Sequence, residues 1–188
     1  MTIRTFAIIV CLLSLSVSPA IAGNQTTPYK QGAGITIDHE PFIRQTFDLA
    51  ISSGKHGNHT FGALLVHQGK VVLTAENTVN TDANCTHHAE TNLVSKAKRE
   101  LSPEVIREST LYASTEPCSL CCAAMYYVGF KRVVYGVSSK GLAKLTGWHD
   151  EGLSCNEFYR YKGGRIDWIG PVLEEEGTKV FRYMPKKN

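Results

Sequence analysis

Two short fragments of the sequence carry side chains of the kinds that bind a metal ion and move protons. They are His88–Glu90 and Pro117–Cys121. Two cysteine thiolates and one neutral imidazole form a favourable ligand set for Zn²⁺. Three protein ligands leave one coordination position open to water, as in catalytic zinc sites, whereas structural sites close with four. The sequence therefore predicts a catalytic zinc site on His88, Cys118 and Cys121.

Glu90 adds a proton-transfer group to this predicted site. It stands two residues after His88, too near along the chain to add usefully to the metal ligands. A carboxylate in that place can take a proton from water and pass it to a leaving nitrogen. A Cys-x-x-Cys alone is weak evidence, because in an exported protein it can equally form a disulfide. The combination of His-x-Glu with a later Pro-Cys-x-x-Cys is typical of zinc-dependent nucleobase deaminases.

The elements that must position these residues follow from the apolar periodicity. Helical spacing predicts helices over residues 38–53 and 87–99, and the Ala, Met and Leu content predicts one over residues 118–128. Short apolar runs predict strands over residues 61–67, 71–75, 111–113 and 132–137, with weaker signals at 166–169 and 179–183. This order indicates an α/β protein with helices packed on a mixed sheet.

Both fragments therefore fall at the start of a predicted helix. The free N–H groups and the dipole of a helix N-terminus favour thiolates. Cys118 and Cys121 are three residues apart, so both face one side of their helix. Gly62, inside the first predicted strand, indicates that another backbone approaches it closely.

The chain resembles the cytidine and deoxycytidylate deaminase superfamily, and within it the purine-type group that holds guanine deaminase and tRNA adenosine deaminase. Five segments carry the resemblance: Phe61–Val66, Ala75–Asn77, Thr86–Asn92, Thr115–Cys121 and Arg132–Gly136. The resemblance implies a three-layer α/β/α fold around a five-stranded mixed sheet, and a homodimer. It also implies zinc on the three predicted ligands and Glu90 as the proton shuttle.

The same resemblance implies substrate-binding roles. Asn77 is expected to hydrogen-bond the substrate, and the backbone N–H of Ala89 to help hold the base. Phe61 could stack on a base, although a phenylalanine in a strand is more often a core residue. Guanine deaminases use a carboxylate from their C-terminal part. The nearest candidate is Asp150, in a polar and aromatic cluster with Trp148, or the adjacent Glu151.

Length and composition favour one soluble domain behind a leader. The chain has 188 residues, and a length of this order usually forms one core. Residues 1–22 have one basic residue, a short apolar run and an Ala-x-Ala end, which predict a secretory signal peptide. Residues 23–37 are interpreted as an N-terminal arm and 38–188 as the zinc-dependent deaminase domain. We therefore expect export to the periplasm or the exterior, with no membrane association after cleavage.

The charge balance bears on possible partners. The chain carries 20 basic and 17 acidic residues, a formal net charge of +3, which is too mild to require a nucleic-acid or membrane partner. Export also makes tRNA an unexpected substrate. A small free nucleobase or nucleoside is the expected partner.

Five cysteines follow the predicted signal peptide, and an odd number cannot all pair within one chain. Beyond the two predicted ligands, Cys122 is interpreted as a small buried apolar residue. Cys85 and Cys155 either pair with each other or remain separate thiols.

Three functional hypotheses remain at this point. The first is a zinc hydrolase that deaminates a purine-like base or nucleoside, with a ring similar to that of guanine or guanosine. The second is deamination of another amino-substituted ring, such as a pyrimidine or a pterin. The third is a secreted zinc or disulfide protein without catalysis, in which Cys118 pairs with Cys121. Glu90 favours the two enzymes, since a binding module has no use for a carboxylate beside an open metal site.

Overall fold

The computed structural model describes residues 30–31, 35–148 and 152–185 of the chain. The predicted signal peptide, most of the predicted arm and Asp150 lie outside the described residues. The domain boundaries drawn from the sequence therefore stay predictions. None of the helices in the described part is long and apolar enough to cross a membrane.

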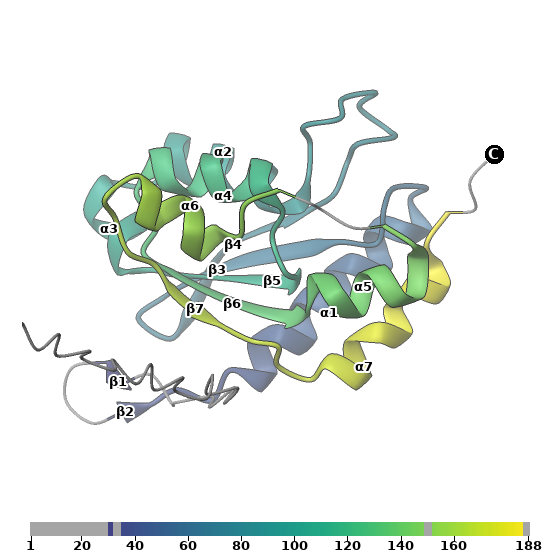
Figure 1. The fold of residues 1–188 in the computed structure, drawn as a ribbon, viewed down its shortest axis with the longest axis horizontal. Coiled ribbons are helices and arrows are strands. Elements are labelled where there is room, and N and C mark those ends of the chain that lie inside the picture. Colours follow the sequence, from purple (N-terminus) through teal and green to yellow (C-terminus); the bar gives the residue numbers. More distant parts are fainter. Residues whose placement is uncertain (1–29, 32–34, 149–151, 186–188) are drawn as a thin grey trace, which may run out of the picture.

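The centre of the fold is a five-stranded mixed sheet in the order β4-β3-β5-β6-β7 (Figure 1). β3 pairs antiparallel with both β4 and β5, whereas β5-β6 and β6-β7 are parallel pairs. The strands span Gly62–His67 (β3), Lys70–Glu76 (β4), Thr110–Thr115 (β5), Arg132–Val137 (β6) and Asp167–Ile169 (β7). A separate two-stranded ribbon pairs Lys30–Gln31 (β1) with Ile35–Thr36 (β2).

One face of the sheet is covered by four helices. They are Ala89–Glu100 (α2), Pro103–Glu108 (α3), Ser119–Val128 (α4) and Cys155–Tyr161 (α6). Their apolar sides meet Leu65, Leu111 and Val133 of the sheet in one buried cluster. The metal-binding fragments begin α2 and α4, so this layer positions the site.

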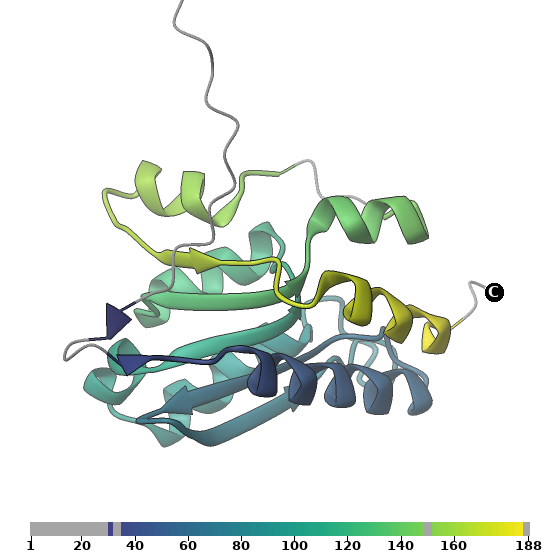
Figure 2. The ribbon, with the colours of Figure 1, turned by 90° about the horizontal axis from the view of Figure 1, so that it is seen from below.

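The opposite face is covered by α1 (Glu40–Lys55) together with the C-terminal segments α7 (Glu174–Thr178) and η1 (Lys179–Tyr183). Ile43 and Phe47 of α1 pack on Leu64 and Val134 in a second buried cluster. Figure 2 shows α1 in front of the sheet and the α2–α4 layer behind it. A further helix, α5 (Ser139–Thr146), follows β6. The three-layer α/β/α fold with a five-stranded mixed sheet is confirmed.

Two details of the sequence interpretation can be compared with this fold. Gly62 does lie against another backbone, because a Cβ placed on it would be 2.6 Å from the carbonyl oxygen of Thr46 in α1. The strand predicted at residues 179–183 is wrong, since this segment is the 3-10 helix η1. Its apolar residues Val180 and Phe181 pack into the cluster under α1, where a helical turn brings both inward.

Candidate active site

The three predicted metal ligands converge where two helices of one layer begin. His88 is the N-cap residue of α2 and Cys118 is the N-cap residue of α4, while Cys121 lies in the first turn of α4. N-cap side chains usually accept a hydrogen bond from their own helix, but neither His88 nor Cys118 does so. Both side chains are therefore available to a ligand outside the helix.

The donor atoms have the spacing that a tetrahedral zinc site needs. His88 Nδ1 lies 3.5 Å from the Sγ of Cys118 and 3.5 Å from the Sγ of Cys121, and the two sulfur atoms are 3.6 Å apart. Tetrahedral coordination at ordinary Zn–S and Zn–N lengths places such donors about 3.6–3.8 Å apart. Among the described residues this is the group of three metal-binding side chains whose ligand atoms all lie within 4.8 Å of one another. The residues fit Zn²⁺.

The two cysteines are electrostatically prepared for a cation. A hydrogen bond from Cys121 and the nearby His88 imidazole lower the pKa of Cys118 to about 4. The same contact with Cys118, together with burial, raises the pKa of Cys121. The pair therefore retains one proton, on Cys121. A bound cation would displace this proton, because cysteine binds a metal as the thiolate.

Glu90 is buried beside these thiols. Its residue is 5% exposed, and its Oε2 lies 3.5 Å from the Sγ of Cys121. Burial raises the pKa of Glu90 to about 7, and the negative charge of Cys118 acts in the same direction. A carboxyl group with a pKa near neutrality can both accept and donate a proton.

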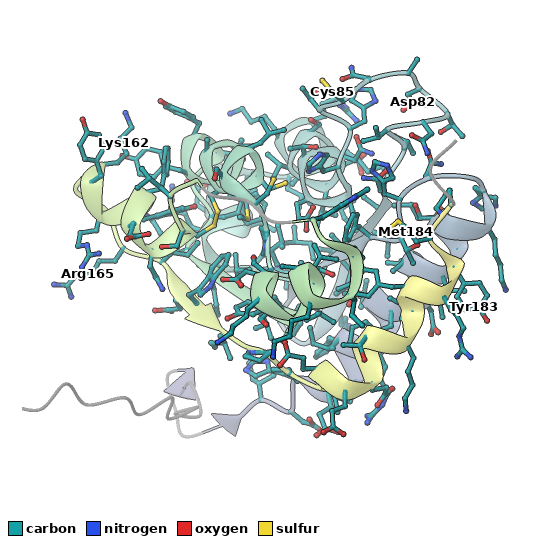
Figure 3. The ribbon with its side chains drawn as sticks, turned by 45° about the vertical axis from the view of Figure 1, so that its right-hand side comes forward. Asp82, Cys85, Lys162, Arg165, Tyr183 and Met184 are labelled. Carbon is teal, nitrogen blue, oxygen red and sulfur yellow. A yellow bond between two sulfur atoms is a disulfide. The ribbon has the colours of Figure 1, made fainter. Side chains whose placement is uncertain are left out.

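The loop between β4 and α2 orients His88. A hydrogen bond to Cys118 raises the pKa of His88, and a second one to the backbone of Cys85 adds to this effect. A backbone acceptor behind a ligating histidine fixes the tautomer and the ring orientation. Figure 3 shows Cys85 and Asp82 at the outer edge of the molecule, and the Cys85 thiol is free and exposed.

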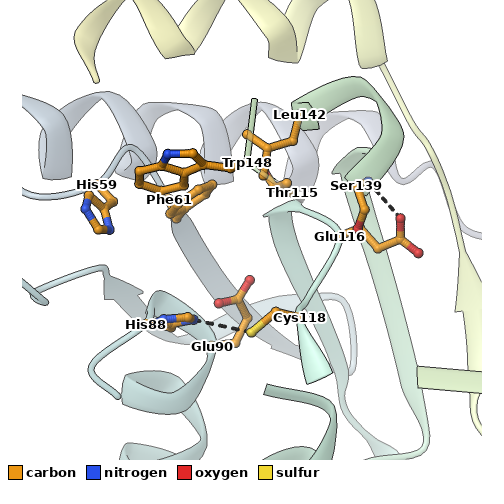
Figure 4. A pocket seen from close by; sticks show the side chains of 10 residues that line it. All are labelled: His59, Phe61, His88, Glu90, Thr115, Glu116, Cys118, Ser139, Leu142 and Trp148. Atoms are coloured by element: carbon orange, nitrogen blue, oxygen red, sulfur yellow. Dashed lines mark hydrogen bonds between the residues drawn. The ribbon is translucent and has the colours of Figure 1, made fainter. Parts of the chain in front are cut away.

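A cavity of about 290 Å³ opens directly above the metal ligands. Ten residues from five parts of the chain line it (Figure 4): His59, Phe61, His88, Glu90, Thr115, Glu116, Cys118, Ser139, Leu142 and Trp148. Figure 4 places His88, Glu90 and Cys118 on one wall, with the rings of Phe61 and Trp148 facing them. These two rings have centroids 6.4 Å apart. An aromatic wall opposite the metal ligands suits a flat ring.

Of the predicted substrate-binding residues in the described part of the chain, Phe61 is among the lining residues of the cavity, whereas Ala89 and Asn77 are not. Phe61 lines the cavity and also packs against the core. Ala89 is the first residue of α2, directly between His88 and Glu90. Asn77 is 1% exposed and its backbone N–H donates to the Phe61 carbonyl, while its Nδ2 has no partner among the described residues. The binding roles of these residues stay predictions.

Other lining residues were not identified from the sequence. His59 contacts Trp148, with ring centroids 4.7 Å apart, and burial lowers its pKa. Leu142 belongs to α5, a short helix that gave no clear periodic pattern. Thr115 immediately precedes the Glu-Pro-Cys segment. This proximity to a predicted metal ligand was the signal in the sequence that Thr115 could lie near the site.

Glu116 lines the cavity but its carboxylate is engaged elsewhere. Oε2 accepts a 2.8 Å hydrogen bond from the Ser139 N–H, and Oε1 accepts a 3.3 Å bond from Trp168 Nε1. Figure 4 shows this carboxylate turned toward Ser139. Glu116 thus ties the turn before α4 to the start of α5 and to β7.

The remaining cysteines correct the sequence interpretation. Cys122 forms a disulfide with Cys155, so it is not simply a buried apolar residue, and Cys155 does not pair with Cys85. Pairing depends on the approach of α6 to α4, which the sequence pattern did not show. Cys118 and Cys121 are both free thiols, which contradicts the alternative of a disulfide between them.

Comparison with known proteins places this geometry in a family context. The family model described as the cytidine and deoxycytidylate deaminase zinc-binding region matches residues 36–137. The matched range contains all three zinc ligands and Glu90.

Individual relatives agree with this match. The chain is 31% identical over 143 residues to a probable cytosine deaminase of Schizosaccharomyces pombe, covering 72% of this chain and 85% of that protein. It is 31% identical over 109 residues to guanine deaminase of Bacillus subtilis, covering 57% and 70%. The solved guanine deaminase of Nitrosomonas europaea has the same fold, with a TM-score of 0.63 at 18% identity over 75% of this chain and 81% of that one.

Proposed function

The chain belongs to the cytidine and deoxycytidylate deaminase family of zinc-dependent hydrolases, and on that premise we propose that it removes the exocyclic amino group of a small free nucleobase or nucleoside. A guanine-like purine is the first candidate ring. The observation that carries the proposal is the buried Glu90 carboxyl, beside three zinc-binding side chains, in the wall of a small cavity.

The proposed reaction exchanges the amino group for an oxygen from water. When bound by His88, Cys118 and Cys121, Zn²⁺ supplies a Lewis acid that makes water nucleophilic near neutral pH. Glu90 takes a proton from the water and delivers it to the ring nitrogen next to the reacting carbon. It then takes the second proton of that water from the new hydroxyl group and delivers it to the departing amino group, so that ammonia leaves and a ring carbonyl remains.

The cavity supports a small uncharged ring. Its walls are mainly apolar or aromatic, through Phe61, Leu142 and Trp148. No lysine or arginine is among the described residues that line it. A phosphate-bearing substrate would need such cationic side chains for charge neutralisation, so a free base or nucleoside fits this surface better than a nucleotide.

Deamination of a pyrimidine is the second candidate. The Schizosaccharomyces pombe relative, which is matched over 85% of its own length, is described as a probable cytosine deaminase. The Bacillus subtilis relative and the solved structure are guanine deaminases. Contacts in the pocket decide between rings of this kind.

The proposal is tested by ammonia release from the zinc-loaded protein. The panel is guanine, guanosine, adenine, adenosine, cytosine, cytidine and an aminopterin, with Glu90→Gln as the matched control. We expect turnover of one ring class that Glu90→Gln abolishes. Absence of turnover across the panel, with one zinc bound per chain, would overturn the assignment to nucleobases and nucleosides.

Export and a homodimer are parts of the same proposal. The Cys122–Cys155 disulfide supports export, since disulfides persist in oxidising compartments. Cell fractionation of the full-length protein and light scattering of the purified protein test these two points. A reduced cytoplasmic protein, or a monomer at working concentration, would contradict them.

A further inference from the structure

Thr115 is the last residue of β5, where the strand leads into the turn before α4. Thr115 lines the cavity and is 3% exposed. Its Oγ1 is buried and has no hydrogen-bond partner among the described residues. A buried hydroxyl without a partner destabilises a folded protein, and few are retained without a reason.

The other polar side chains of β5 show that this is particular to Thr115. Thr110 Oγ1 accepts a hydrogen bond from Arg132, and the Tyr112 hydroxyl lies 2.9 Å from His39 Nδ1. Ser114 Oγ accepts a 3.1 Å bond from the Gly62 N–H. Within this strand the residue with the unpartnered hydroxyl is therefore the one that lines the cavity.

We propose that the Thr115 hydroxyl hydrogen-bonds the substrate ring and helps to set which ring the protein accepts. This inference rests on the proposed function. Figure 4 shows Thr115 near Leu142 and across from the side chains that hold the metal site. Because the nearby wall is apolar, through Leu142 and Trp148, a polar atom of the ring has few other partners there.

The chemistry of a hydroxyl defines the class of ligand that it favours. A threonine hydroxyl both donates and accepts, so it suits a ring with a carbonyl oxygen or a ring nitrogen on the edge that faces β5. A ring that presents only carbon at this edge would leave the hydroxyl unpaired and would be disfavoured. Sites built to pair with a polar group reject analogues that lack it much more strongly than apolar pockets reject a change in size.

The test uses the zinc-loaded full chain with Thr115→Val and Thr115→Ser. Valine keeps the shape of the side chain and removes the hydroxyl, whereas serine keeps the hydroxyl. Thr110→Val, at the other end of the same strand, is the matched control, because it removes a hydroxyl that is already paired with Arg132. For each variant, kcat/KM over the ring panel and the thermal midpoint are measured.

We expect Thr115→Val to lower kcat/KM for the preferred ring by about 10- to 100-fold and to reduce the preference among rings. Its thermal midpoint should be unchanged or higher, since an unpaired buried hydroxyl is lost. Thr115→Ser should keep the wild-type ring preference. Thr110→Val should show the reverse pattern, with a lower midpoint and unchanged kcat/KM.

Three results would overturn the inference in distinguishable ways. If the wild-type protein deaminates a ring and Thr115→Val matches it in kcat/KM and preference, the assignment of Thr115 fails alone. The assignment fails as well if activity and the thermal midpoint of Thr115→Val fall together, because the hydroxyl is then structural. If the wild-type protein neither deaminates nor binds any ring of the panel, the proposed function fails and the assignment fails with it.

Discussion

Cys122, the residue after a zinc ligand, is covalently joined to Cys155 at the start of α6, with Cα atoms 5.2 Å apart. The bond fastens α4, whose start carries Cys118 and Cys121, to the first residue of α6. It also removes a thiol that would otherwise stand beside the metal ligands. The pairing therefore leaves two defined cysteines for the metal.

Replacement of both disulfide cysteines by alanine should lower stability. The two bonded cysteines are 33 residues apart in the sequence. Loss of such a constraint lowers the free energy of unfolding by about 3 kcal/mol. For a chain of this size that corresponds to a fall of about 6–12 °C in the thermal midpoint. Thermal unfolding of zinc-loaded Cys122→Ala/Cys155→Ala against wild type measures this. Cys85→Ala, at an exposed free thiol, is the control and should not shift the midpoint. Equal midpoints for the double variant and wild type would contradict the pairing.

Gly62→Ala should destabilise the fold because α1 lies directly against this position. The added Cβ would be 2.5 Å from Leu49 Cβ, 2.6 Å from the Thr46 carbonyl oxygen and 2.7 Å from the Ala50 nitrogen. Overpacking of this kind lowers the free energy of unfolding by about 1–3 kcal/mol. Denaturant unfolding measures the change. Gly164→Ala is the matched control, since its Cβ would meet nothing closer than 3.4 Å. A neutral Gly62→Ala would show that α1 and β3 are not in such close contact.

Asn58 holds the loop that leads to His88. It is 2% exposed, and its Oδ1 accepts hydrogen bonds from Asn80 N, Thr81 N and Thr81 Oγ1. Asn58→Ala leaves these donors unpaired, so we expect a loss of about 1–3 kcal/mol in the free energy of unfolding. Zinc affinity should weaken as well, because the loop orients a ligand. Chemical unfolding and a competitive zinc titration measure the two effects, with exposed Asn156→Ala as the control. Unchanged values for both would refute this role.

Removal of the metal should destabilise the wild-type protein. A ligand present at a thousand times its dissociation constant stabilises the folded state by about 4 kcal/mol. Chelation should therefore lower the thermal midpoint, and added zinc should restore it. His88→Ala should lose this response, because only two thiolates remain of the three donors. A midpoint of His88→Ala that still rises with zinc would place the metal elsewhere.

The sequence predicted the metal ligands well because their placement is local. His88 and Cys118 stand at helix starts, which apolar periodicity predicts for α2 and residue content predicts for α4. Cys121 follows Cys118 by three residues on the same helix. The order of strands and helices was readable for the same reason, since α1 and α2 are long enough to show an apolar stripe and α4 is rich in helix-forming residues.

The rest of the site could not be predicted because distant segments build it. His59, Thr115 and Leu142 meet only in the folded chain, and α5 and α6 are too short for a helical pattern to be distinct. The Cys122–Cys155 pairing depends on the packing of α6 against α4. The 179–183 segment gave only a weak strand signal, and in the fold it is a 3-10 helix whose Val180 and Phe181 pack into the cluster under α1.

The most direct test of the central claim compares zinc content and ammonia release in the same preparation of Glu90→Gln. Glutamine keeps the shape of the side chain but cannot shuttle protons, so the account predicts one zinc per chain, a wild-type fold and a kcat lower by about 10²–10⁴-fold on the ring that wild type turns over. Glu90→Gln protein that binds zinc and retains wild-type turnover would contradict the account.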